Sequence, residues 1–494
     1  MSEPTSTSRS ARSAAGLLLV PTFVALELFG GVIQGWITPL LGEIATHYQV
    51  GGGAVGWILT VGLLSSAVSV PLMTMLADRY GARRMLVLAV ALTAIGSTMI
   101  AFAPVFPLVL LGSIVQGPVA AMLPIEMSLL KHHRPESANR IVGILVGTLT
   151  FGVALGSLGG GLVMEAVGDL VVAQAIGAAP LVILALVVGF TVPSTAGDPD
   201  RVVDWAGAGL FGVALVGVMY GLSEGSNAGW TSPLALVPLV LGLVAFIAFL
   251  MVENRATTPL FDVKLLRRAK LGVPMVLGVL VAMTMFGSQT PTVLYLSADP
   301  ELVGYGAGFS TGLVGIVFAS TALVMTAGSF LAPLLARRAG LRATIVAACV
   351  LMAAGMVVLL VAPAGPGLAT AVFATTALGT GVMLAVLPGV VIDRAPETAS
   401  ASVSGLYNTG RTLGGSLAGA LVASIMTAFV AAGAAGTVGD APPATPFAAF
   451  QVIWAIFAAV LIAAAVLALS LGPRRAATPS PATADDALEI GARP

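Results

Sequence analysis

Fourteen stretches of about 20 or more mostly apolar residues follow one another along the 494-residue chain. A helix of roughly 20 apolar residues crosses the ~30 Å hydrocarbon layer of a bilayer. The runs are continuous rather than alternating, which favours helices over the strands of a membrane barrel. The chain is therefore predicted to be an all-α integral membrane protein. The runs lie at about 15–40, 54–77, 85–103, 105–130, 141–166, 168–192, 204–223, 232–252, 271–296, 308–335, 342–362, 367–392, 401–430 and 447–472.

The composition excludes several other classes of protein. Only 9% of the residues are charged, against roughly 25% in soluble proteins. The 22 basic and 22 acidic residues balance, so no basic face is left for nucleic acid. Cys349 is the one cysteine and the three histidines lie in polar connectors, so neither a disulfide framework nor a metal site is expected. The sequence has no Walker A motif and no catalytic constellation, so we expect neither an enzyme nor a bound cofactor.

The basic residues set the direction of the spans. Lys and Arg concentrate on the cytoplasmic side of membrane proteins. With the N-terminus placed in the cytoplasm, every basic residue but Arg411, which is inside a span, falls in a cytoplasmic segment. This arrangement predicts fourteen spans in the inner (cytoplasmic) membrane, with both termini in the cytoplasm.

The chain also contains an internal repeat. The loop after the second span, Leu76–Arg83, resembles the loop after the tenth, Leu335–Arg342. The stretch Pro135–Ala138 after the fourth span resembles Pro396–Ala399 after the twelfth. Because both pairs keep the same sidedness, spans 1–6 match spans 9–14 in parallel. The expected units are a cytoplasmic tail (1–14), an N-terminal six-helix bundle (15–192), a two-span insert (193–252), an amphipathic cytoplasmic linker (253–270), a C-terminal six-helix bundle (271–472) and a disordered cytoplasmic tail (473–494).

Four motifs occur in a fixed order along the chain. They are TMLADRYGARR after span 2, GVALGSLGGG in span 5, an insert that runs from VDWAGAG to VENRATTPLFDVKLLRR, and SVSGLYNTGRTLGGSLAG in span 13. Together they resemble the fourteen-span drug:proton antiporter branch of the major facilitator superfamily, over residues 15–472. The resemblance implies two parallel six-helix bundles around a central cavity, and proton-driven export of a drug or secondary metabolite by alternating access.

The resemblance assigns roles to two of these motifs. It implies that the loop after span 2 forms a cytoplasmic gate that holds the halves together, through Asp78, Arg79, Gly81 and Arg83. A generic basic loop is the alternative. In span 5, Gly152, Gly156, Gly160 and Gly161 share one helix face, where small residues allow close helix approach. Packing alone explains them at least as well as a mechanistic role.

Charges inside the spans are the main candidates for function. Glu27 lies near the middle of span 1, Glu126 lies near the cytoplasmic end of span 4, and Arg411 lies well inside span 13. A buried carboxyl favours its protonated form, so it can exchange a proton near neutral pH. Arg411 either pairs with one of these acids or holds substrate; a fixed ion pair is the structural alternative. Polar residues that either line a cavity or bond between helices are Gln34, Gln116, Gln289 and Asn408. Met283 and Met285 are interpreted as lipid-facing packing rather than as cavity lining.

The sequence also departs from the family pattern. Ser113 stands where the family carries an arginine in span 4, Ser157 replaces a proline in span 5, and small residues around Gly30 replace the usual acid of span 1. The leading hypothesis is a monomeric exporter of an amphipathic small molecule, coupled to protons through Glu27 and Glu126. A proton-independent facilitator and a non-transporting membrane scaffold are the alternatives.

Overall fold

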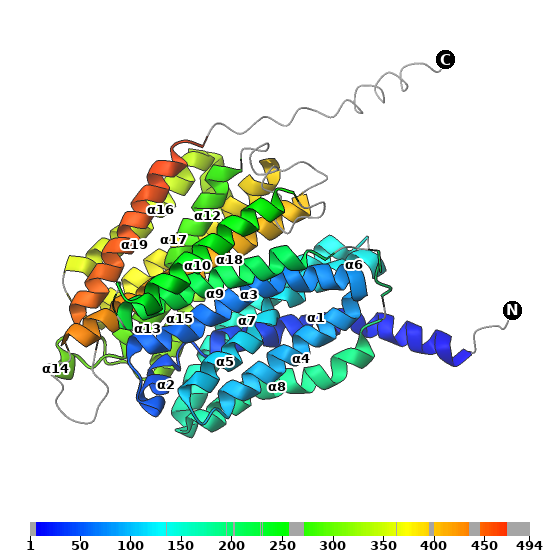
Figure 1. The fold of residues 1–494 in the computed structure, drawn as a ribbon, viewed down its shortest axis with the longest axis horizontal. Coiled ribbons are helices and arrows are strands. Elements are labelled where there is room, and N and C mark those ends of the chain that lie inside the picture. The colour runs from blue at the N-terminus through cyan, green and yellow to red at the C-terminus, as the bar shows by residue number, and fades with distance from the viewer. Residues whose placement is uncertain are drawn as a thin grey trace, which may run out of the picture.

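The computed structural model describes residues 6–134, 136–193, 195–200, 203–227, 229, 231–255, 271–361, 363–394, 400–433 and 445–471. Within these ranges the regular structure is entirely helical (Figure 1). Fourteen helices, or pairs of consecutive helices, are long and apolar enough to cross a membrane. Each matches one predicted run, so the fourteen-span prediction is confirmed.

The first six spans form the N-terminal half. The helices are α1 (Ser6–Trp36), α2 (Leu41–Tyr48), α3 (Gly52–Tyr80), α4 (Ala82–Ala101), α5 (Phe106–Gln116), α6 (Met122–His133), α7 (Ala138–Val167) and α8 (Leu170–Thr191). Span 4 is α5 and α6 joined by a short 3₁₀ helix, Gly117–Ala121. The backbone helix α1 begins at Ser6, within the segment expected to be a tail.

The insert and the C-terminal half follow. The helices are α9 (Trp205–Asn227), α10 (Pro233–Glu253), α12 (Gly272–Gly287), α13 (Gln289–Ser297), α14 (Pro300–Val303), α15 (Thr311–Ala339), α16 (Leu341–Val361), α17 (Pro366–Arg394), α18 (Ser400–Gly433) and α19 (Phe447–Ala468). Most of the expected linker 253–270 and the whole expected tail 473–494 lie outside the described residues.

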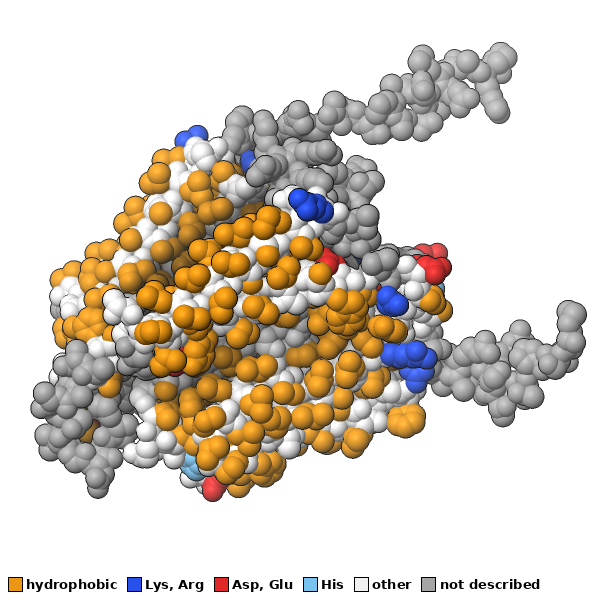
Figure 2. Space-filling view, viewed as in Figure 1, with side chains coloured by type: hydrophobic (Ala, Val, Ile, Leu, Met, Phe, Trp, Pro, Cys, Tyr) orange, Lys and Arg blue, Asp and Glu red, His pale blue; other side chains and the backbone are white. Residues whose placement is uncertain are grey.

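Two ends of the helix bundle are distinguished by charge. The basic end carries the arginines after α3 and α15 and Lys131 and Arg134 at the end of α6. The opposite end is formed by α2, α13 and α14 (Figure 1). Figure 2 shows blue side chains gathered at the basic end, with a broad apolar belt between the two ends. That belt suits contact with lipid, because contiguous apolar surface of this extent is rare on soluble proteins.

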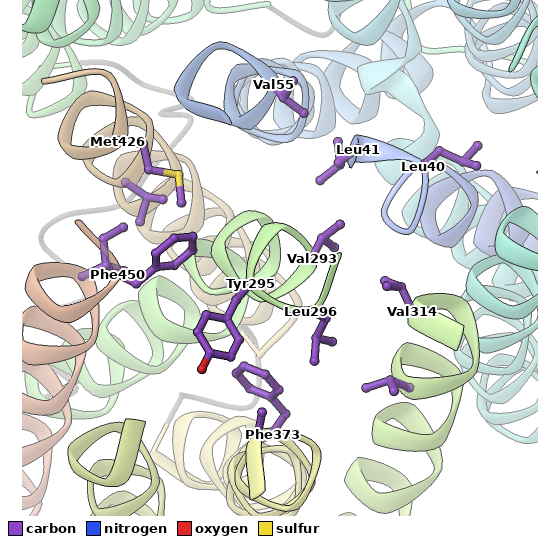
Figure 3. Close-up of a cluster of buried hydrophobic side chains, with 14 of the residues drawn as sticks. Leu40, Leu41, Val55, Val293, Tyr295, Leu296, Val314, Phe373, Met426 and Phe450 are labelled. Atoms are coloured by element: carbon purple, nitrogen blue, oxygen red, sulfur yellow. The ribbon is translucent and has the colours of Figure 1, made fainter. Parts of the chain in front are cut away.

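One end of the molecule has a core that the two halves share. One cluster joins N-terminal Leu40, Leu41 and Val55 to C-terminal residues that include Val293 and Val314, and Figure 3 shows these side chains facing a common interior. Two further clusters lie toward the basic end. One draws only on α1–α8 and the segment just after α8, and the other only on residues from Leu271 onward. The halves are thus packed together at the opposite end and have separate cores at the basic end.

The insert α9–α10 covers one of the two lines along which the halves meet. These lines are the α3–α18 seam and the α7–α15 seam. Phe211 and Phe249 of the insert share a buried cluster with Leu64 of α3 and Ala420 of α18. The Ser424 hydroxyl of α18 donates to the Leu222 carbonyl of α9 at 3.0 Å. The insert therefore contacts both halves rather than only linking them in sequence.

Candidate functional site

Two cavities lie between the halves. The first has a volume of about 190 Å³ and is enclosed by α1, α7, α12, α13, α15, α16 and α17. The second has a volume of about 320 Å³ and lies among α1, α3, α6, α7, α18 and the 3₁₀ segment of span 4. Gln34 of α1 lines both cavities. The two spaces are therefore neighbours, separated at this side chain.

The first cavity is polar without being charged. Its wall holds threonine and serine hydroxyls, two glutamines, two phenylalanines and several methionines, and none of the described residues that line it is Asp, Glu, Lys or Arg. The hydroxyls come from Thr38, Ser157, Thr284, Ser288, Thr292, Thr321, Thr376 and Thr380; the thioethers come from Met285, Met325, Met352 and Met356. Such a wall supplies hydrogen bonds and adaptable apolar contacts together.

The second cavity contains an acid. Glu27 lines it and is only 3% exposed. Glu126 is fully buried just behind the wall, next to the lining residues Pro124 and Leu123. The two carboxyl groups lie within hydrogen-bonding reach of each other. Among the described residues, no N–H or hydroxyl group donates to either oxygen of Glu126.

This contact has a direct chemical consequence. Ionised carboxylates only accept hydrogen bonds, and two like charges cannot both persist at short range in a low-dielectric interior. The two acids therefore form a hydrogen bond when one carboxyl is protonated and its O–H donates to an oxygen of the other. The geometry brings together the two acids that were proposed from the sequence as separate candidates.

Span 4 is broken just before the helix α6 that carries Glu126. The helix is interrupted at Gly117-Pro118, because proline has no N–H to continue the ladder. The hydroxyls of Ser65 and Ser66 on α3 donate to the carbonyls of Ile114 and Gly117, at 2.5 and 3.0 Å. Carbonyls that a broken helix leaves free in a membrane need such partners.

Arg411 is not paired with either acid. Within the described part of the chain its guanidinium contacts the Met285 sulfur at 3.9 Å and lies 5.8 Å from the centroid of the Tyr407 ring. Met285 lines the first cavity, which corrects the interpretation of Met285 as lipid-facing packing. Helix α12 is rotated so that Met285 faces the interior. A run that is apolar all round does not indicate this rotation. Met283 packs, partly buried, against the large core cluster.

The polar candidates separate into two groups. Gln34 and Gln289 line the first cavity, and Gln34 and Asn408 line the second. Gln116 instead donates to the Ser97 hydroxyl of α4 at 2.8 Å, an interhelical hydrogen bond. Ser113, at the position of the family arginine, donates to Val109 in its own helix.

The glycines of span 5 allow α7 to touch α1 backbone to backbone. A methyl group on Gly152, Gly156 or Gly160 would lie 2.1–2.4 Å from the carbonyl oxygens of Leu28, Val32 and Trp36. Gly161 faces the other way, toward Thr311 and Gly315 of α15. Helix α7 thus packs closely against α1 of its own half on one side and against α15 of the other half on another. Gly31 and Gly35 of α1 face α7. No packing role was predicted for them from the sequence, although they too lie four residues apart.

The loop after span 2 packs against the end of the N-terminal half. Gly81 has φ +99°, a conformation that favours glycine, and a methyl group there would lie 2.5 Å from the Thr195 carbonyl oxygen. The Arg83 guanidinium donates to the Gly189 carbonyl, and the amide of Asp198 donates to the Asp78 carbonyl at 2.9 Å. Arg79 lies over the Tyr80 ring. These contacts tie the loop to α8 and the segment after it.

The opposite end is closed by polar contacts as well as by the shared core. The Thr311 hydroxyl of α15 donates to Glu43 of α2 at 2.8 Å, and Ser310 donates to Glu165 of α7 at 3.3 Å. Tyr305 donates to the Thr445 carbonyl. Burial, with a smaller contribution from Tyr295, raises the pKa of Tyr305 to about 12. The Tyr305 hydroxyl therefore remains a donor at any physiological pH.

Two helical halves that close around internal cavities at one end define a membrane transporter of the alternating-access class. Residues 23–419 match the Major Facilitator Superfamily. The chain belongs to this superfamily, and so it is a transporter rather than an enzyme.

The chain is similar to several transporters at low identity. It is 25% identical to the multidrug efflux pump LfrA of Mycolicibacterium smegmatis, over 96% of this chain and 93% of LfrA. It is 27% identical to the tetracenomycin C resistance and export protein of Streptomyces glaucescens, over 76% and 69%. A match at 23% identity to the uncharacterised MFS-type transporter YhcA of Bacillus subtilis spans 64% of this chain and 59% of YhcA.

Solved structures support the fold. The xylose transporter XylE of E. coli superposes with a TM-score of 0.58 at 13% identity, covering 94% of this chain and 99% of XylE. The POT family transporter PepTSo superposes with a TM-score of 0.65 at 14% identity, covering 91% of this chain and 97% of PepTSo.

Proposed function

We propose that the protein exports an amphipathic small molecule from the cytoplasm in exchange for protons. The observation that carries this proposal is the Glu27–Glu126 pair, which has no described donor on Glu126 and needs a shared proton. Glu27 lines the second cavity, so its proton has a path to the same interior that a substrate enters. The names of the relatives, which include efflux and export proteins, support the direction of transport.

The orientation follows from charge. We place the basic end and both termini on the cytoplasmic side of the cell membrane, because Lys and Arg concentrate there. The separate cores of the two halves at that end support a state open toward the cytoplasm. Proton influx across 100 mV supplies about 2.3 kcal/mol per charge, enough for roughly 50-fold accumulation of a substrate.

Proton movement in proteoliposomes tests the proposal. An internal pH dye would follow vesicles that hold the purified protein under an imposed proton gradient. The added compounds would be ethidium, N-phenyl-1-naphthylamine and 8-anilino-1-naphthalenesulfonate. We expect at least one compound to trigger proton flux in the wild type. We expect Glu27→Gln and Glu126→Gln to abolish that flux, because an amide cannot release a proton.

A matched acid outside the cavities serves as the control. Glu301→Gln changes an exposed residue of the short helix α14 and should leave the proton flux unchanged. Compound flux without proton movement in the wild type would contradict antiport. It would instead favour the facilitator that the serine at position 113 suggests, with Glu27 and Glu126 in a structural role.

A further inference from the structure

We propose that the first cavity binds aromatic organic anions, with the anionic group of the ligand at Arg411. This inference rests on the proposed function, because it names the class of molecule that the transporter carries.

The described wall of the first cavity carries no charge. No acidic side chain is among the described residues that line the first cavity, so a bound cation would leave water without a counter-charge, which is costly in an interior of low dielectric. Glu27 lines the second cavity, on the other side of Gln34, and faces Glu126. The first cavity therefore disfavours permanent cations.

Arg411 is a positive charge inside span 13. Its two contacts in the described part of the chain are a thioether and an aromatic face. A thioether is a weak acceptor, so the guanidinium lies within a span and has no counter-anion among the described residues that contact it. A guanidinium presents a planar fork of donors that suits carboxylate and sulfonate oxygens. A ligand anion would supply the partner that the protein itself does not.

Met285 lies between the first cavity and Arg411. Met285 both lines the first cavity and contacts Arg411. Methionine is unbranched and changes conformation readily, so rotation of this side chain opens the guanidinium to the cavity. Phe318, Phe373 and Met352 line the same space. Aromatic rings and thioethers favour contact with the flat faces of an aromatic ligand.

Equilibrium binding in phosphatidylcholine nanodiscs tests the proposal. The probes are 8-anilino-1-naphthalenesulfonate and N-phenyl-1-naphthylamine, which share one aromatic skeleton and differ by the sulfonate, together with ethidium as the cation. Signal from empty nanodiscs is subtracted. We expect the wild type to bind the sulfonate about tenfold more tightly than the neutral amine, and to bind ethidium most weakly.

Substitutions at one position then separate charge from shape. Arg411→Gln should weaken binding of the sulfonate about tenfold and leave the neutral amine unchanged, and Arg411→Lys should restore part of the loss. Arg338→Gln, the same change at an exposed residue of the basic end, should alter neither affinity. Equal affinities of the wild type for the two naphthalene probes, or a preference for ethidium, would overturn the proposal without any variant.

The binding experiment also separates this proposal from proton antiport. Binding in nanodiscs needs no proton gradient, so antiport can fail in proteoliposomes while the Arg411-dependent preference persists. Conversely, proton flux triggered by ethidium alone, with no sulfonate binding, would support antiport and reject an anion site.

Discussion

At the scale of single residues, Gly156 is the point where the backbones of α7 and α1 approach each other most closely among the three span 5 glycines that face α1. An added methyl group would lie 2.1 Å from the Val32 carbonyl oxygen, so Gly156→Ala must push α1 and α7 apart. We expect a loss of about 1–3 kcal/mol in the free energy of unfolding. The buried thiol of Cys349 reports unfolding when it reacts with a thiol-specific fluorophore during heating.

Gly147→Ala provides the matched control on the same helix. A methyl group at Gly147 meets no atom within 4 Å, and alanine is the better helix former, so its melting temperature should not fall. Equal losses for both variants would contradict a specific contact between α1 and α7.

Residue identity alone predicted part of the site. Glu27, Glu126 and Arg411 stood out because charges are rare in membrane spans. Their partners could not be predicted, because contact between α1 and α6, or between α12 and α18, depends on helix rotation and tilt. Met285 illustrates the limit: an apolar run is hydrophobic all round, so its pattern does not reveal which face meets the interior.

At the scale of elements, the N-terminal end of α15 contacts the carboxylates of Glu43 and Glu165 from the N-terminal half. Anions stabilise a helix N-terminus, and Thr311 adds a hydrogen bond to Glu43. We expect Thr311→Val to weaken closure of the opposite end by about 1 kcal/mol, roughly a fivefold shift between conformations. A cysteine at Thr60, which is buried against Gly419 in the α3–α18 seam, should then react correspondingly faster with a maleimide.

Thr370→Val is the control for that measurement. The Thr370 hydroxyl bonds the Pro366 carbonyl within its own helix, so its removal should leave the reactivity at position 60 unchanged. Slower reaction in Thr311→Val would show that the contact does not hold this end closed.

The sequence predicted elements better than their placement. Runs of about 20 apolar residues locate spans because the bilayer sets a length, and each predicted run coincides with a helix or helix pair. The 3₁₀ break in span 4 was not predicted, although Gly117-Pro118 is a visible signal for it. Nothing in the insert's sequence indicated that it would lie over the α3–α18 seam.

At the scale of the whole molecule, the structure is closed at one end and divided at the other. Asn408 is exposed and lines the second cavity, whereas Thr60 is fully buried between the halves. We expect a cysteine at Asn408 to react quickly with a membrane-impermeant maleimide, and a cysteine at Thr60 to react at least tenfold more slowly, because reaction there requires the minor conformation. Comparable rates at the two positions would indicate a different resting state.

The position of the insert has a consequence for molecules dissolved in the membrane. Insert residues that include Leu210, Phe211 and Phe249 share a buried cluster with α3 residues between Trp57 and Val68 and with α18 residues between Leu406 and Ala420. A compound diffusing within the lipid toward that side meets two extra helices before it meets the halves. The α7–α15 seam has no such cover from α9 or α10. Sideways entry from the bilayer is therefore unequal around the protein, with one flank shielded by its own polypeptide.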